Sequence, residues 1–145
     1  MIGVIPAAGK ASRMGQIGSE LPKALKLQER AATVGFDWPG VAPVLSKLHE
    51  ELEEVRAEFD RPARDPERLT DEIGDLLFVC VNLARHGKVD PCAALRHANA
   101  KFERRFRRME QLAAEAGTPL AELPLDAQDR YWAQAKSEEP KKGPE

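Results

Sequence analysis

The segment over residues 66–85 is the feature that most restricts how this chain can fold. Asp65 and Pro66 form a strong helix start, because an Asp side chain caps free backbone amides and proline suits the first helical turn. From Leu76 onward the segment is apolar on nearly every side, and Gly87 follows as a typical helix end. We therefore predict a long helix here, at the centre of a helical fold.

The rest of the chain after residue 25 also has the spacing of amphipathic helices. Further helices are predicted over residues 25–34, 43–59, 91–116 and 125–136. The second of these places its apolar residues on one stripe: Val44, Leu45, Leu48, Leu52, Val55 and Phe59. Because the connections are short and no strand-like alternation occurs, the predicted fold is all-α, a bundle of four to five helices. We expect dimerisation to complete it, since so long an apolar helix is hard to cover within a small chain.

Both ends of the chain differ from this helical region, which is predicted as one domain over residues 26–137. Residues 1–25 predict a short strand, Ile2–Ile5, followed by a loop of small residues, and they resemble the start of sugar-phosphate nucleotidyltransferases. This segment is too short for an independent domain, because the further strands of a nucleotide-binding sheet are not encoded. Residues 138–145, with two prolines and two lysines, are expected to be disordered.

Composition argues against several classes of protein. The formal net charge is −2, which gives no general attraction to nucleic acid or to acidic membranes. Cys80 and Cys92 are too few for a disulfide framework and lack the spacing of zinc ligands, so we interpret them as structural thiols. The longest apolar run is far shorter than a membrane span, and no cleavable signal peptide is visible. We therefore expect a cytoplasmic protein.

Two acidic pairs in neighbouring predicted helices are the strongest indication of chemistry. Glu51 with Glu54, and Glu72 with Asp75, are each three residues apart, so that both members of a pair lie on one helix face. A solvated surface would explain either pair alone. Glu51 borders the apolar stripe, however, and the second pair adjoins the most apolar helix, where charges need compensation. Hard oxygen ligands favour Mg²⁺ or Mn²⁺, usually with phosphate as the other partner.

Cations and aromatic residues elsewhere would complete such a site. Lys101 and Arg105 lie four residues apart and share a helix face, from which they would bind phosphate oxygens. Trp132 and Lys136 repeat this spacing, and Trp38 would help to shape a pocket for a base. A solvated cationic face and aromatic core anchors are the structural alternatives. A di-iron site is disfavoured, because no histidine follows a glutamate by three positions.

Several motifs occur in order over about residues 27–136: Glu50-Glu51-x-x-Glu54, Glu72-x-x-Asp75 before Leu-Leu-Phe, Lys-Phe-Glu-Arg-Arg-Phe at 101–106, and Trp132 with Lys136. Together they resemble the MazG family of nucleoside triphosphate pyrophosphohydrolases. The resemblance implies an all-α, usually dimeric, magnesium-dependent enzyme that converts nucleoside triphosphates to monophosphates and pyrophosphate, with a role in cleaning the nucleotide pool. It implies metal ligands at Glu51, Glu54, Glu72 and Asp75, substrate contacts at Lys101, Arg105, Trp132 and Lys136, and a general base at Glu50.

Two functions of other classes stay open at this point. A non-catalytic nucleotide-binding or regulatory module would keep the site but release little pyrophosphate. A helical nucleic-acid-binding protein would use the basic residues within 91–116. The negative net charge and the acids that alternate with these cations disfavour nucleic acid as a partner.

Overall fold

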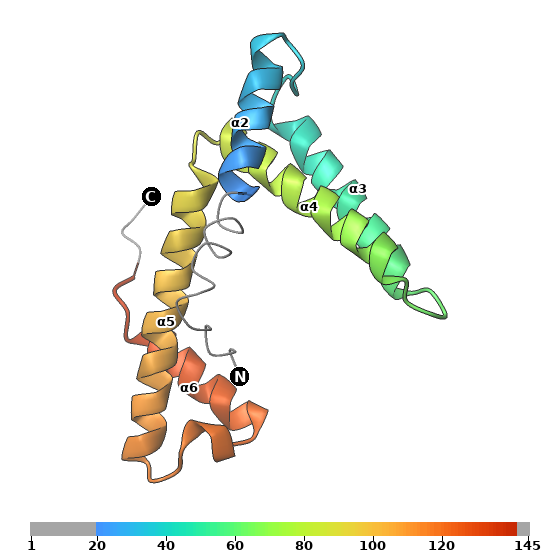
Figure 1. Ribbon diagram of the computed structural model, residues 1–145. Helices are drawn as coiled ribbons and strands as arrows, with labels where there is room; N and C mark the ends of the chain where they lie inside the picture. The colour runs from blue at the N-terminus through green and yellow to red at the C-terminus, as the bar shows by residue number, and fades with distance from the viewer. Residues whose placement is uncertain (1–19, 142–145) are drawn as a thin grey trace, which may run out of the picture. The chain divides into compact units, whose positions relative to one another are not determined.

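The computed structural model describes residues 20–141 as an all-helical structure. Its elements, in chain order, are α2 (Glu20–Thr33), α3 (Val41–Phe59), α4 (Pro66–His86), α5 (Pro91–Glu115), the 3₁₀ turn η2 (Leu120–Glu122) and α6 (Leu125–Ser137) (Figure 1). The predicted all-α class is confirmed. Within residues 20–141, every helix is too short or too polar to cross a membrane.

The chain divides into two compact units, with the boundary between Ala94 and Leu95. The sequence predicts one helical domain over residues 26–137, and this region contributes to both units. The first unit holds α2, α3 and α4, and the second holds most of α5 together with η2 and α6. Each unit has buried apolar residues of its own.

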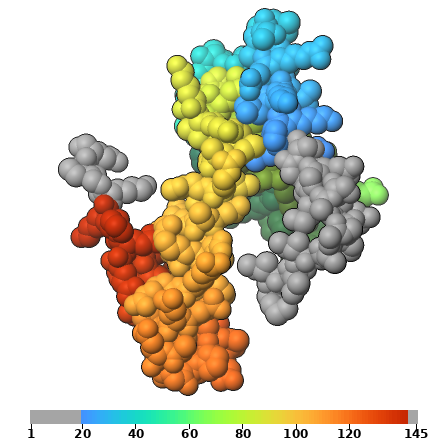
Figure 2. Space-filling model, turned by 60° about the vertical axis from the view of Figure 1, so that its left-hand side comes forward, coloured from blue at the N-terminus to red at the C-terminus, as the bar shows by residue number. Residues whose placement is uncertain are grey.

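The first unit is built on a hairpin of α3 and α4. These two helices run antiparallel and pack along their length, and α2 packs against α4 (Figure 1). Figure 2 shows α2 in contact with the end of α4. The buried apolar side chains between the helices are small and β-branched: Val44, Val55, Val79 and Val81. Small side chains permit close approach of the helices, so polar residues along the contact are brought near one another.

Larger apolar residues of the hairpin remain exposed in the single chain. Leu52 on α3 is 50% exposed and Leu77 on α4 is 61% exposed. The other exposed members of this set are Val41, Leu45, Phe59, Ile73 and Phe78. Within the predicted stripe on α3, Val44 and Val55 are buried, whereas Leu45, Leu52 and Phe59 are exposed. Glu51 and Glu58 complete the buried face of this helix. The helix α4, predicted to be central, likewise keeps an exposed apolar face.

Helix boundaries lie within two residues of those predicted, with one exception. Asp65 accepts hydrogen bonds from two backbone amides at the start of α4, and Asp90 accepts one at the start of α5. The helix α2 begins at Glu20, well before the predicted start at residue 25, since Pro22 is tolerated in a first turn. The predicted strand Ile2–Ile5 lies outside the described residues.

The second unit packs α6 and η2 against the later turns of α5. Its core consists of Met109, Ala113, Leu120 and Ala135, covered by Leu123, Tyr131 and Trp132. After α6, Glu138 and Glu139 form ion pairs with Arg108 and Arg105 on α5. The prediction of a disordered tail from residue 138 is therefore wrong for these two residues, because their carboxylates reach arginines of the same unit. Residues 142–145 lie outside the described part of the chain.

Replacing Asp65 with Ala should lower the free energy of unfolding by about 1 kcal/mol, because the change removes the side-chain acceptor at the start of α4. Urea unfolding followed by circular dichroism measures this loss. Asp60→Ala is the matched control, since Asp60 lies in the same loop and its side chain caps no helix start. An equal loss in the two variants would contradict the cap.

Candidate active site

The α3–α4 hairpin brings three acidic side chains together. Glu51 comes from α3, and Glu72 and Asp75 come from successive turns of α4. One carboxylate oxygen of each residue lies within 4.8 Å of the others. Glu72 and Asp75 share a helix face because they are three residues apart, and the packing of the hairpin sets that face against Glu51. We call these three residues the carboxylate cluster.

The carboxylate cluster has more acceptors than donors. Glu51 is only 5% exposed, and the Oε2 atoms of Glu51 and Glu72 are buried without a hydrogen-bond partner among residues 20–141. A buried carboxylate oxygen without a partner is strongly unfavourable, so such groups are normally paired or bind a metal. A set of ligands made only of carboxylate oxygens fits a hard divalent cation such as Mg²⁺ or Mn²⁺.

Repulsion among the acids is visible in their pKa values. Glu54, one turn after Glu51 on α3, is exposed, yet hydrogen bonding with Glu72 and then with Glu51 raises its pKa to about 7. Burial, followed by the negative charge of Asp71, raises the pKa of Asp75. Glu54 lies outside the carboxylate cluster as defined by distance, but it contacts two of its members when it carries a proton.

Lys47 provides a positive charge beside the carboxylate cluster that the sequence reasoning did not single out. Its Nζ atom lies 3.0 Å from Glu51 Oε1 and 3.3 Å from Glu50 Oε1. The bond to Glu51, followed by that to Glu50, raises the pKa of Lys47. The signal for it was the four-residue spacing from Lys47 to Glu51 on one helix face. Glu50, the predicted general base, has 58% of its side chain exposed and is paired with Lys47.

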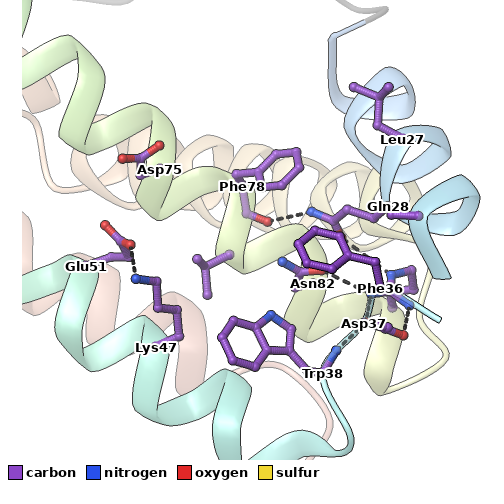
Figure 3. Close-up of a pocket in the computed structure, with 13 residues that line it drawn as sticks. Leu27, Gln28, Phe36, Asp37, Trp38, Lys47, Glu51, Asp75, Phe78 and Asn82 are labelled. Atoms are coloured by element: carbon purple, nitrogen blue, oxygen red, sulfur yellow. Dashed lines mark hydrogen bonds and ion pairs between the residues drawn. The ribbon is translucent and has the colours of Figure 1, made fainter. Parts of the chain in front are cut away.

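A cavity of about 540 Å³ opens beside the carboxylate cluster (Figure 3). Glu51, Asp75 and Lys47 lie at one end of it. The opposite end is apolar and largely aromatic, lined by Leu27, Phe36, Trp38 and Phe78. Pockets for small ligands typically measure about 300–1,000 Å³. The cavity therefore combines a charged end, suited to phosphate with a metal, and an aromatic end, suited to a base.

An ion pair that the sequence reasoning missed holds the aromatic end in place. Arg85, near the end of α4, donates to both carboxylate oxygens of Asp37. Asp37 also accepts a hydrogen bond from the backbone amide of Trp38 and lies 3.2 Å from His86 Nε2. The bond from Arg85 is the main reason that the pKa of Asp37 is far below its usual range. No local pattern indicates this pair, because only folding brings residues 37 and 85 together.

The other predicted substrate residues belong to the second unit. The guanidinium of Arg105 lies 5.4 Å from the centroid of the Trp132 ring, and Arg105 is paired with Glu139. Trp132 also packs on the core of this unit, as the structural alternative predicts. Lys136, one turn after Trp132, is exposed, and Lys101, one turn before Arg105, is partly buried. Arg105 and Trp132 are thus brought together, and both already have contacts within the unit.

Comparison with known proteins assigns this arrangement to a family. Residues 41–109 match the family described as "MazG nucleotide pyrophosphohydrolase domain", a span that includes the whole carboxylate cluster. The chain is 45% identical over 130 residues to the nucleoside triphosphate pyrophosphohydrolase/pyrophosphatase MazG of Thermotoga maritima. This match covers 88% of the chain and 49% of the relative. This chain contains a MazG-type domain.

Other MazG-like relatives give the same picture. A nucleoside triphosphate pyrophosphohydrolase of Escherichia coli K12 is 42% identical over 131 residues, covering 88% of this chain and 50% of the relative. The uncharacterized protein YabN of Bacillus subtilis is 46% identical over 68 residues, covering 47% of this chain and 14% of the relative. The chain thus spans about half the length of the two pyrophosphohydrolases that it matches.

The raised pKa of Glu54 predicts how pH affects the metal-free protein. Between its unfolded value of 4.5 and about 7, the folded state binds more protons at Glu54 than the unfolded state does. This contribution to the free energy of unfolding is therefore present at low pH and is lost as pH rises through 7. Because a cation competes with that proton, added Mg²⁺ should stabilise the protein more at pH 8 than at pH 6.

Urea unfolding with and without Mg²⁺ at these pH values, on the wild type and on Glu54→Gln, measures the effect. The variant has no carboxyl at this position, so we expect its metal-free stability to lose less between pH 5 and pH 8 than that of the wild type. Identical pH profiles in the two proteins would show that Glu54 does not titrate in this range.

Proposed function

We propose that this chain hydrolyses nucleoside triphosphates between the α- and β-phosphates, giving a nucleoside monophosphate and pyrophosphate with Mg²⁺ or Mn²⁺. The observation that carries the proposal is the pair of buried, unpartnered oxygens on Glu51 and Glu72, because Glu51 lines the charged end of a nucleotide-sized cavity and Glu72 lies beside it in the carboxylate cluster. The printed activity of the Thermotoga maritima and Escherichia coli relatives supports the same reaction. Removal of unwanted nucleotides from the cellular pool is the role that we propose for it.

Four acids would hold the cation: Glu51, Glu54, Glu72 and Asp75. A divalent cation bound to them would neutralise phosphate oxygens and lower the pKa of a coordinated water. Glu54 must release its proton before it can act as a ligand, since its pKa is raised by neighbouring acids. The three residues of the carboxylate cluster are held by opposed helices, so their oxygens stay close to one another when substrate binds.

Lys47 and Glu50 would act on the α-phosphate and on the attacking water. Lys47 contacts Glu51 and lines the cavity, so its ammonium can exchange a carboxylate for a phosphate oxygen without leaving the site. That exchange would free Glu50 from its bond with Lys47. An exposed Glu50 beside the cluster is then able to accept a proton from the water, which is the general-base role that we propose for it.

We also propose substrate contacts outside the carboxylate cluster. We propose that Trp38, at the aromatic end of the cavity, stacks on the base. In the second unit, we propose Arg105 and Lys136 as further substrate contacts. Arg105 now pairs with Glu139, so phosphate must displace that carboxylate, and the lowered pKa of Glu139 indicates that it competes as an anion. The remaining proposed contacts in this unit are Lys101 and Trp132.

We also propose that two copies of the chain associate through the exposed apolar face of the hairpin. Leu52 and Leu77 are at least half exposed, although soluble proteins rarely leave adjoining large apolar side chains in water. Leu45 and Leu52 are seven residues apart, as are Leu52 and Phe59, which gives a continuous stripe along α3. Association of two hairpins would bury this stripe and produce a four-helix bundle.

Glu51→Gln and Asp75→Asn should each lower magnesium-dependent pyrophosphate release at least about a hundredfold, because each removes a charged ligand from the carboxylate cluster. Steady-state assays that separate pyrophosphate from orthophosphate, with circular dichroism as a folding check, measure this loss. Glu53→Gln is the matched control, since Glu53 lies on α3 and is paired only with the exposed Arg56. Near-normal turnover in Asp75→Asn would contradict the metal assignment.

The same assay separates the proposal from a non-catalytic nucleotide-binding module. Such a module would bind nucleoside triphosphates in calorimetry and release no pyrophosphate above a metal-free blank. Orthophosphate as the first product would place the cleavage at a different phosphoanhydride.

Leu77→Lys should convert the dimer to a monomer at micromolar concentration, because it puts a charge on the exposed apolar face. Sedimentation velocity measures the mass. Glu53→Lys serves as the control, since it adds the same side chain at an exposed polar position on α3 and should leave the dimer intact. A wild-type chain that sediments as a monomer would refute the association.

A further inference from the structure

We infer that Asn82 selects the nucleobase, by donating a hydrogen bond that favours bases with an exocyclic carbonyl over bases with an exocyclic amino group at the same position. This inference rests on the proposed function only in taking a nucleotide as the ligand of the cavity. Asn82 is buried in α4 and lines the cavity at its aromatic end, near Phe36, Trp38 and Phe78 (Figure 3).

Arg85 fixes which way the Asn82 amide faces. The Nη2 atom of Arg85 lies 3.1 Å from Asn82 Oδ1. A guanidinium can only donate, so the oxygen of Asn82 must face Arg85, and its NH₂ group must face away from it. Arg85 in turn is held by both oxygens of Asp37, which leaves it little freedom to turn. The described residues offer Asn82 Nδ2 no hydrogen-bond partner, so it is available to a ligand.

The same arginine occupies the side-chain acceptors at this end of the cavity. Besides Asn82 Oδ1, Arg85 contacts both oxygens of Asp37 and lies 3.5 Å from Gln28 Oε1. The amide nitrogen of Gln28 donates to the backbone carbonyl of Phe78, at 2.9 Å, so this carbonyl is also occupied. A donor on the base would therefore share acceptors that already have a donor, whereas an acceptor on the base finds the NH₂ group of Asn82.

The aromatic residues around the cavity increase the energetic difference between a donor and an acceptor on the base. Phe36, Trp38 and Phe78 line the same end of the cavity and are themselves exposed, so a base stacked on them would be shielded from water on the faces that they cover. In such surroundings an amino group that faces another donor leaves two groups unsatisfied, which is far less favourable than in water. Apolar stacking alone would accept every base, because all bases have the same kind of aromatic face. We therefore assign the selection to the Asn82 amide.

Two pairs of nucleotides differ in this group and in the adjacent ring nitrogen, which carries a hydrogen in UTP and ITP but not in CTP and ATP. UTP has a carbonyl where CTP has an amino group on the pyrimidine, and ITP has a carbonyl where ATP has an amino group on the purine. We expect the wild type to show kcat/KM about tenfold higher for UTP than for CTP, and for ITP than for ATP. Within each pair the triphosphate, sugar and ring size are the same, so the ratio reports only the base edge.

Variants of Asn82 test the donor directly. Asn82→Ala removes it and should bring both ratios close to one. Asn82→Asp has nearly the same shape but presents only acceptors, so it should favour CTP and ATP instead. Leu27→Ala is the control for damage to the cavity, since Leu27 lines it without any polar group and should lower both members of a pair equally. Wild-type ratios close to one, or ratios unchanged in Asn82→Ala, would overturn the inference.

Equilibrium binding separates this inference from the proposed reaction. Calorimetry with UTP, CTP, ITP and ATP in the presence of Ca²⁺, without turnover, should show the same preference in the wild type and its loss in Asn82→Ala. Selective binding without any pyrophosphate release would contradict the proposed reaction and support the role of Asn82. Pyrophosphate release with equal binding of all four nucleotides would do the reverse.

Discussion

The packing of α3 against α4 is the interaction on which the rest of the structure depends. Small valines between the helices allow a close approach, and this approach brings Glu51 into contact with Glu72 and Asp75. Charge repulsion among three acids this close together disfavours the packing of the hairpin. One lysine, Lys47, offsets only part of this repulsion. The apolar contact therefore holds a constellation that is incomplete without further positive charge. That imbalance is the physical basis for expecting a metal ion.

The cavity next to this cluster changes character along its length. Its charged end is set by the hairpin, and its aromatic end by the turn after α2, which the Asp37–Arg85 ion pair ties to α4. Arg85 has two roles at the aromatic end: it anchors Trp38 through Asp37, and it orients Asn82. A nucleotide has the same progression from phosphate to base, so one small unit can offer matching groups to both ends.

Much of the fold could be predicted from the sequence because helix periodicity and caps are local signals. Asp65 and Asp90 mark helix starts in the sequence, and the structure has helices there. The acidic spacing likewise gave three residues that the structure brings together. Tertiary partners were missed: the Asp37–Arg85 pair joins distant segments, and Glu139 pairs with Arg105 although a charged, proline-containing end suggests disorder.

Anomalous diffraction from crystals soaked with Mn²⁺ tests the central claim most directly, because it locates the cation without relying on turnover. The account predicts an anomalous peak bonded to carboxylate oxygens of Glu51, Glu72 and Asp75, at the charged end of the cavity. Mn²⁺ bound elsewhere on the protein, with these three carboxylates left without metal, would contradict it.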